Sequence, residues 1–266
     1  MTTPDLLSDF GATQPAARAA EASSFLLWDL PLRVFHWALV AAVTTAVVTG
    51  ELGGAWMPWH GRAGLVIVGL LVFRLAWGIV GSATSRFTQF APMPAALLAY
   101  VRGRWRGVGH NPLGALAVFA LLGLLAAQVA TGLFGNDDIA FAGPLNHLVG
   151  DDTGDRLTGW HRLLADGLFA LLALHLAAIA FHVVVKRHRL VRPMITGRQR
   201  AVPGAPRPPR VVTGRYGLIG AVALAAAVVL AISGADRAPM QAPGPAATRV
   251  VAEPVAAPAL AAAPAW

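Results

Sequence analysis

Long apolar runs alternate with polar segments along most of this chain. Five of the runs are long enough to cross the roughly 30 Å hydrocarbon core of a bilayer as helices. They cover residues 32–50, 61–80, 112–134, 159–185 and 216–233. Because short connections join the first four runs, the pattern predicts an all-α integral membrane protein. We expect an up-and-down four-helix transmembrane bundle and a fifth, C-terminal transmembrane helix, with no internal repeat beyond these hairpins.

These runs divide the chain into five parts. Residues 25–200 form the predicted four-helix transmembrane domain, and residues 216–233 form the fifth helix. A Pro/Arg-rich linker, residues 201–215, joins them. The polar, Ala-rich residues 1–24 and the Ala/Pro-rich tail, residues 234–266, are expected to be disordered. Since the N-terminal part has no apolar core of its own, no cleavable signal is expected before the first span.

The charges of the connections predict the orientation of the bundle. Residues 81–110 contain four arginines and no acid, and residues 186–215 contain one lysine, eight arginines and no acid. In contrast, residues 134–158 carry five aspartates and one arginine. The positive-inside rule therefore places the N-terminus and both basic connections in the cytoplasm. We expect a multi-pass protein of a bacterial inner membrane whose acidic connection and tail face the periplasm.

Overall composition narrows the kinds of chemistry that this chain can perform. Hydrophobic residues make up 56% of it and charged residues only 13%, which is typical of a membrane protein. The net charge of +8 is explained by cytoplasmic Lys and Arg, so we expect no nucleic-acid partner. The chain has no cysteine, which excludes disulfides, thiolate-bound iron–sulfur clusters and covalent haem attachment through C-x-x-C-H.

Four histidines within the apolar runs are the candidate functional residues. His161 and His175 are 14 residues apart in the fourth run. In a helix this spacing puts both rings on one side, about 21 Å apart along the axis. Ionisable side chains inside a membrane span are costly and usually mark a functional site. The other two, His36 and His60, are then available as their partners.

The direction of each helix decides which histidines lie at the same depth. The first helix runs outward, so His36 lies near its cytoplasmic side, whereas the second helix begins at the outer surface with His60. The fourth helix runs inward, with His161 at the outer level and His175 at the inner level. Two level pairs follow, His60–His161 and His36–His175. Each pair offers two imidazoles from facing helices, the ligand set for a bis-histidine haem, so we predict two non-covalently bound haem b groups.

Further residues are candidates for contacts with these groups. Arg62 and Arg162 lie beside the outer pair, and Arg33 and Arg74 lie near the inner level, where they could bind haem propionates. His182 lies seven residues beyond His175 on the same face. It could bind a propionate, line a quinone pocket or replace His175 as the ligand.

The remaining polar candidates have simpler interpretations. His110 and His147 lie in connections and are expected to be solvated or interfacial. His188 lies in a basic run and is expected at the surface, next to lipid headgroups. Gln128, the lone amide of the third span, is interpreted either as a helix–helix hydrogen bond or as a cofactor contact.

Several sequence blocks together resemble the prokaryotic cytochrome b561 family, which overlaps the b-type cytochrome subunits of nickel–iron hydrogenases. The resemblance covers roughly residues 25–200. The blocks are WDLPLRVFHW at 28–37, WHGRAGLVIVGLLVFRLAWGIVGS at 59–82, RFTQF at 86–90, GHNPLGAL at 109–116, TGLFGNDDIAFAGPL at 131–145, LTGWHRLLADGLFALLALHLAAIAFH at 157–182 and LVRPMITG at 190–197. The resemblance implies a four-helix, two-haem membrane cytochrome that exchanges electrons with the quinone pool. Its ligand positions fall on His36, His60, His161 and His175.

Two functions are consistent with these features, and a third is disfavoured. The first is electron transfer across the membrane between quinone or quinol and a periplasmic redox protein, such as a cytochrome c, with or without quinol oxidoreductase activity of its own. The second is a membrane anchor and electron-transfer subunit of a peripheral redox enzyme, such as a Ni/Fe-hydrogenase. A transporter without a cofactor is disfavoured because the spans are not broken in corresponding halves.

Overall fold

The computed structural model describes residues 24–105, 107, 109–137, 139, 141–200 and 211–235. Within them, five helices are long and apolar enough to cross a membrane. They are α2 (Leu30–Leu52), α3 (Met57–Val80), α5 (Pro112–Phe134), α6 (Asp151–Val184) and α8 (Arg215–Ala235). The protein is therefore an all-α, multi-pass membrane protein, as predicted. The expected disordered termini and most of the linker lie outside the described residues.

Short elements occupy the connections, and the hydrophobic pattern predicted none of them. Two are helices of one or two turns, and three are single 3-10 turns. Two short strands pair antiparallel, with Ser24 opposite Arg200. The elements are β1 (Ser24–Leu26), η1 (Gly54–Trp56), η2 (Phe87–Gln89), α4 (Pro94–Val101), η3 (Asn146–Leu148), α7 (Val191–Thr196) and β2 (Arg198–Arg200).

Side-chain caps fix the starts of two of the long helices. The Asp29 carboxylate accepts a hydrogen bond from the backbone N–H of Leu32 at 2.9 Å, and the Asn111 side chain accepts one from Gly114 at 2.7 Å. Both helices have a proline in the first turn, where the missing N–H breaks no helical hydrogen bond. These local signals explain why α2 and α5 begin where they do.

The fourth span begins earlier than the apolar pattern indicates. Helix α6 starts at Asp151 and has 34 residues, whereas the predicted span starts at residue 159. Asp151 and Asp152 in its first turn are favourable next to the positive end of the helix dipole, which extends the helix into the acidic connection. At 1.5 Å per residue the helix is about 51 Å long, so its ends extend beyond the hydrocarbon core.

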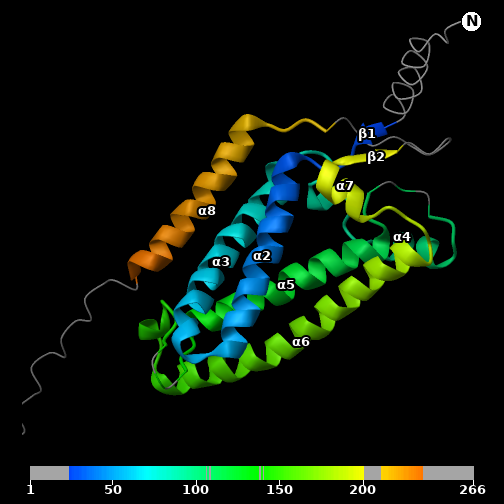
Figure 1. The fold of residues 1–266 in the computed structure, drawn as a ribbon. Coiled ribbons are helices and arrows are strands. Elements are labelled where there is room, and N and C mark those ends of the chain that lie inside the picture. The colour runs from blue at the N-terminus through cyan, green and yellow to red at the C-terminus, as the bar shows by residue number, and fades with distance from the viewer. Residues whose placement is uncertain are drawn as a thin grey trace, which may run out of the picture. The chain divides into compact units, whose positions relative to one another are not determined.

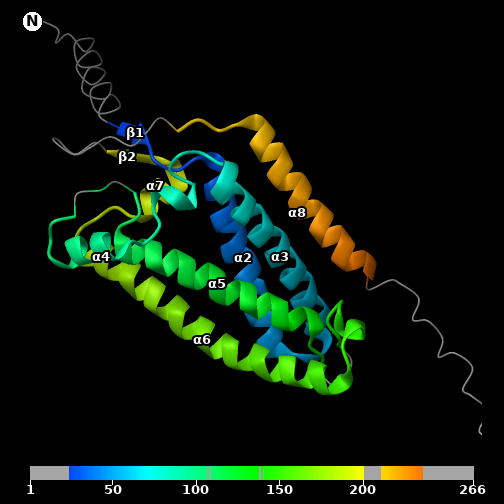
Figure 2. The ribbon, with the colours of Figure 1, turned by 180° about the vertical axis from the view of Figure 1, so that it is seen from behind.

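The long helices form two antiparallel hairpins, α2–α3 and α5–α6, which meet along α3 and α5 (Figures 1 and 2). Helix α8 lies along α3 on the side away from the second hairpin (Figure 1). Its Ala221 and Ala225 are buried against Phe73 and Trp77 of α3. The fifth span is therefore packed on the first hairpin, and small side chains allow the close approach.

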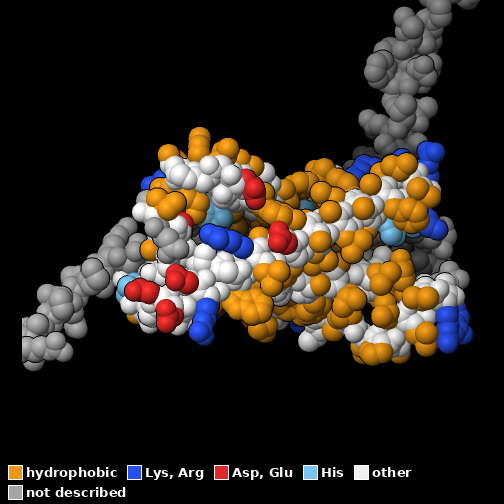
Figure 3. Space-filling model, turned by 90° about the horizontal axis from the view of Figure 1, so that it is seen from below, with side chains coloured by type: hydrophobic (Ala, Val, Ile, Leu, Met, Phe, Trp, Pro, Cys, Tyr) orange, Lys and Arg blue, Asp and Glu red, His pale blue; other side chains and the backbone are white. Residues whose placement is uncertain are grey.

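Acidic and basic side chains separate along the bundle. On the face shown in Figure 3, Asp and Glu gather toward one end, and Lys and Arg predominate at the opposite end, with an apolar surface between them. This distribution follows the connections, since the acidic residues lie around the start of α6 and the basic ones beyond its end. It supports the predicted orientation, which stays a prediction.

Candidate haem sites

The structure brings together the two histidines predicted at the outer level. His60 lies in the first turn of α3, and His161 lies in the third turn of α6. Their ring centroids are 6.0 Å apart, and the ring planes are at 82° to each other. Because a metal–imidazole bond is about 2 Å long, two rings on opposite sides of one metal ion have centroids roughly 6 Å apart. The observed spacing matches that arrangement.

Backbone carbonyls hold both outer rings through the same nitrogen. Nδ1 of His60 lies 2.8 Å from the carbonyl oxygen of Ala46, and Nδ1 of His161 lies 2.9 Å from that of Gln128. A carbonyl can only accept, so each Nδ1 carries the proton and donates it. The lone pair is then on Nε2, the tautomer that a metal-ligating histidine needs.

Each outer ring also lies on a glycine of the neighbouring helix. A Cβ on Gly50 would be 2.9 Å from Nδ1 of His60, and a Cβ on Gly132 would be 2.8 Å from Cε1 of His161. Real Cβ atoms do not approach so closely, and both neighbours are ring atoms without freedom to move aside. Both glycines are therefore needed for the rings to lie where they do.

The surroundings of His60 and His161, here called the outer seats, repeat one local motif that the sequence analysis missed. The carbonyl, threonine and glycine stand at equal spacing in α2 and α5, in the sequences AVVTG (46–50) and QVATG (128–132). Thr49 and Thr131 each donate a side-chain hydrogen bond back to carbonyls one turn earlier in their own helix. The V-x-T-G sequence, which occurs near the outer end of both α2 and α5, could have revealed this motif.

Gln128 makes the outer site asymmetric. Its side-chain nitrogen lies 3.1 Å from Nε2 of His161, the nitrogen with the lone pair, and so donates to it. Its side-chain oxygen is buried without a hydrogen-bond partner among the described residues. His161 must give up the Gln128 hydrogen bond before Nε2 can bind a metal. The amide is then a neighbour of whatever the ring binds.

At the inner level, His36 of α2 and His175 of α6 are close enough to interact electrostatically. Nδ1 of His36 is buried and has no hydrogen-bond partner among the described residues. Both side chains are half-buried. A buried imidazole nitrogen without a partner, on a histidine that lies near a second one, is compatible with a bis-histidine site.

The alternative inner ligand, His182, makes other contacts. Its Nδ1 donates to the carbonyl of Ala178 at 2.8 Å, within its own helix. Its ring lies against His188, with centroids 6.1 Å apart. These contacts place His182 next to the segment that follows α6, and they favour His175 as the partner of His36.

An apolar layer separates the two histidine levels. Leu168 is buried in α6, seven residues from His161 and seven from His175, so about 10 Å from each level. It packs in one cluster with buried residues from all three other helices of the bundle, which are Ala42, Ile67, Leu71 and Leu125. The bundle therefore has two levels that contain histidines, with a layer of apolar side chains between them.

Three of the four candidate arginines are at least partly exposed, so an anionic group could reach them. Arg62 and Arg162 are exposed beside the outer pair, and the Arg62 guanidinium lies over the Trp59 ring, 4.8 Å from its centroid. Arg33 is half-buried and donates from Nη1 to the carbonyl of Ile195. Two exposed cations thus lie beside the outer pair, and one half-buried cation lies near the inner level.

The fourth arginine, Arg74, is only 2% exposed and belongs to a buried network. It donates to the carbonyl of Ser85 at 3.2 Å and lies 4.3 Å from the centre of the Phe87 ring. The buried carboxylate of Asp29 interacts with its charge and accepts hydrogen bonds from Trp77 and Ser85. This network ties the start of α2 to the end of α3 below the inner level.

His110 is more enclosed than the sequence predicts. Its ring lies between Trp28 and Phe90, with centroid distances of 4.6 and 4.7 Å. Nδ1 is buried without a hydrogen-bond partner among the described residues. Burial and the positive charge of Arg74 lower the pKa of His110 to about 4. The solvated interpretation of this histidine was wrong, because Trp28 and Phe90 cover its ring. The interfacial interpretation stays a prediction.

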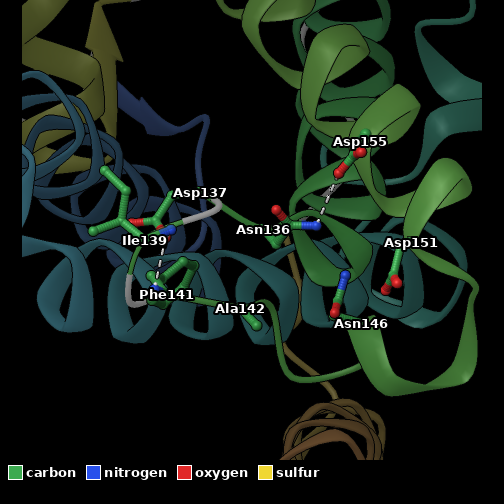
Figure 4. Close-up of a pocket in the computed structure, with 8 residues that line it drawn as sticks. All are labelled: Asn136, Asp137, Ile139, Phe141, Ala142, Asn146, Asp151 and Asp155. Carbon is green, nitrogen blue, oxygen red and sulfur yellow. Dashed lines mark hydrogen bonds between the residues drawn. The ribbon is translucent and has the colours of Figure 1, made fainter.

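The acidic connection folds over the outer end of the first hairpin. Phe141 lies against Gly61, next to His60, where a Cβ would be 2.8 Å from the Phe141 ring. A pocket formed by this connection and the start of α6 is lined by Asn and Asp side chains together with three apolar residues (Figure 4). The lining residues are Asn136, Asp137, Ile139, Phe141, Ala142, Asn146, Asp151 and Asp155.

These observations fit haem better than a metal ion bound by protein ligands alone. No group of three or more His, Asp or Glu side chains suited to a metal ion occurs in the described part of the chain. The outer level instead offers two facing imidazoles of the ligating tautomer, two glycines that accommodate the rings, and cations nearby.

Comparison with known proteins identifies the family of this chain. The model of the prokaryotic cytochrome b561 family matches residues 27–197. The chain belongs to this family. It is a membrane-embedded b-type cytochrome of electron transfer, and its family implies haem b.

Curated relatives of this cytochrome are named as probable B-type cytochrome subunits of Ni/Fe-hydrogenases. It is 24% identical over 180 residues to a probable Ni/Fe-hydrogenase 1 B-type cytochrome subunit of Escherichia coli (strain K12), covering 53% of this chain and 75% of that one. It is 23% identical over 234 residues to a probable Ni/Fe-hydrogenase B-type cytochrome subunit of Bradyrhizobium diazoefficiens, covering 74% and 94%. No solved structure matches significantly.

Proposed function

We propose that this cytochrome holds two haem b groups and relays single electrons across the bacterial inner membrane, between the quinone pool and a redox partner. One group lies between His60 and His161, and the other between His36 and His175. The facing outer rings, 6.0 Å apart, are the observation that carries the proposal. When bound, haem b supplies the one-electron redox chemistry.

The residues of the chain bind and orient the haem groups and separate them by an apolar layer. Two imidazoles at each level would hold the haem as its protein ligands, an arrangement that favours electron transfer over the binding of oxygen or substrate. The carbonyls of Ala46 and Gln128 fix the tautomer of the outer ligands. Arg62 and Arg162 are the outer propionate partners, and Arg33 is the inner one. Arg74 is the weakest candidate, because Ser85 and Phe87 already contact its guanidinium.

A second candidate function is that of an electron-transfer anchor for a peripheral redox enzyme. The names of the curated relatives favour it, since these proteins are named as probable Ni/Fe-hydrogenase B-type cytochrome subunits. The acidic pocket beside the outer level would suit a basic docking surface on such an enzyme or on a soluble cytochrome c (Figure 4). Binding through these charges must weaken as salt rises, and association that is independent of ionic strength contradicts this docking mode.

Quinol reduction of the purified, full-length protein tests the proposal. In proteoliposomes, we expect a reduced-minus-oxidised spectrum with the bands of a b-type haem when a membrane-soluble quinol is added. An acceptor trapped inside the vesicles should then be reduced. Protein without b-type bands would contradict haem binding, and haem that quinol does not reduce would contradict exchange with the quinone pool. Co-purification with a large metalloenzyme would favour the anchor function.

A further inference from the structure

A short segment after α6 fastens the end of the fourth helix to the start of the first. This segment, residues 191–200, contains α7 and β2 and is here called the clasp. In the fold, the clasp lies beside the first turns of α2 (Figures 1 and 2). The chain thereby brings together two parts that are more than 150 residues apart.

Four donors from the start of the chain bind three carbonyls of the clasp, those of Met194, Ile195 and Gly197. Backbone N–H groups of Leu27 and Trp28 donate to the carbonyl of Gly197, at 2.7 and 3.2 Å. On α2, Arg33 donates to the carbonyl of Ile195, and Nε1 of Trp37 donates to that of Met194 at 3.3 Å. Since α7 is ending, these carbonyls lack helical partners, and donors from the start of the chain satisfy them.

Gly197 is the residue on which this arrangement depends. Its φ of 76° is the left-handed conformation that ends a helix and favours glycine. A Cβ there would lie 2.8 Å from the carbonyl oxygen of Trp28 and 3.1 Å from Nε of Arg33. A side chain at this position would therefore push the clasp away from α2.

The position of His36 gives the clasp a functional meaning. Arg33 and Trp37, the two α2 side chains that the clasp holds, lie three residues before and one residue after His36. The chain that enters the clasp comes from α6, which carries His175. We propose that the clasp is a positioning element for the inner haem. It fixes α2 relative to α6, and so holds His36 opposite His175.

This inference rests on the proposed di-haem function, and it predicts a difference between the two levels. The outer rings are held by their own seats at the far ends of the helices, so the clasp should affect only the inner haem. Variants His175→Ala and His161→Ala, in which one haem each should be lost, provide reference spectra for assigning the haem that remains.

The test compares Gly197→Ala with Gly103→Ala in the full-length protein. Gly103 also has a positive φ, 68°, but a Cβ there meets no atom within 4 Å, so it controls for backbone strain alone. We expect Gly197→Ala to lower inner haem occupancy at least twofold, leaving the spectrum of His175→Ala, and Gly103→Ala to keep both haems. A milder variant, Trp37→Phe, should shift only the inner midpoint potential.

The outcomes separate the two proposals. A wild-type protein without two haems would overturn the proposed function. If the wild type binds two haems, two results would overturn the role of the clasp. One is an equal loss of both haems in Gly197→Ala. The other is that Gly197→Ala and Trp37→Phe both keep two haems with unchanged midpoint potentials.

Discussion

Gly50 of α2 and Gly132 of α5 occupy equivalent places beneath the two outer histidines. Each lies four residues after the carbonyl that holds a ring, and each leaves room for that ring. The two hairpins thus present His60 and His161 toward each other from matching seats. The inner level is not duplicated in this way. In α6, the residue 14 positions beyond the outer histidine His161 is the inner histidine His175, but the equivalent residue of α3, 14 positions beyond His60, is Arg74.

The duplicated seat predicts that a single methyl group disturbs the outer site. In Gly50→Ala or Gly132→Ala, the Cβ would collide with an imidazole ring and displace it. We expect at least a twofold loss of outer haem, measured as haem per chain in the purified protein.

Gly64 of α3 and Gly123 of α5 are the matched controls. A Cβ at either position meets no atom within 4 Å. Alanine there should preserve both haems and stabilise the helix by up to about 1 kcal/mol. Equal haem content in the seat variants and these controls would show that the rings are not confined by the glycines.

Because one haem needs both outer ligands, their removal should not be additive. His60→Ala and His161→Ala are each expected to lose the same haem, and the double variant should lose no more. Haem content and the reduced spectrum measure this, with His147→Ala, in the acidic connection, as the control. A double variant that loses both haems would mean that His60 and His161 serve different sites.

Removing the charge of Asp29 should destabilise the protein. Asp29→Asn removes the negative charge that interacts with the buried Arg74 and weakens a carboxylate that accepts hydrogen bonds from Trp77 and Ser85. The thermal unfolding temperature of the purified protein should fall, and Asp29→Asn combined with Arg74→Met should recover part of the loss. A double variant whose loss is the sum of the two single losses would show that the two charges do not interact.

The enclosed ring of His110 predicts sensitivity to acid. Its pKa is about 4 in the folded protein, below the ordinary value of 6.5, so the unfolded chain takes up the proton first. Stability is therefore present above pH 6.5 and is lost as the pH falls toward 4, by at most roughly 3 kcal/mol. In His110→Phe, the unfolding temperature should fall less between pH 7 and pH 4.5.

His147→Phe serves as the comparison for this pH dependence, since His147 is exposed. It should retain the acid sensitivity of the wild type. If His110→Phe and His147→Phe lose stability in parallel with the wild type, other groups dominate the acid response.

The sequence predicts the long helices well because their signal is additive over many residues. Each span is a run of apolar side chains, and no single contact decides it. The third span, Pro112–Phe134, agrees at both ends because a cap and a proline mark its start. The start of α6 was placed too late because Asp151 and Asp152 read as loop residues in a hydropathy pattern, although a helix N-terminus favours them.

The features that the sequence analysis missed depend on single tertiary contacts. The enclosure of His110 depends on Trp28, just before α2, and on Phe90, from an earlier part of the same connection. The clasp depends on one glycine and on carbonyls that periodicity does not reveal. In contrast, helix directions alone predicted that His60 and His161 lie at one level, and the structure brings their rings together. Their role as ligands stays a prediction.

The haem content of three purified proteins tests the central claim most directly. We expect two haem b groups per chain in the wild type, one in His175→Ala and two in His182→Ala, by quantitative haem extraction against protein concentration. Two haems retained in His175→Ala, or one lost in His182→Ala, would contradict the pairing of His36 with His175. A wild type with fewer than two would contradict the di-haem function itself.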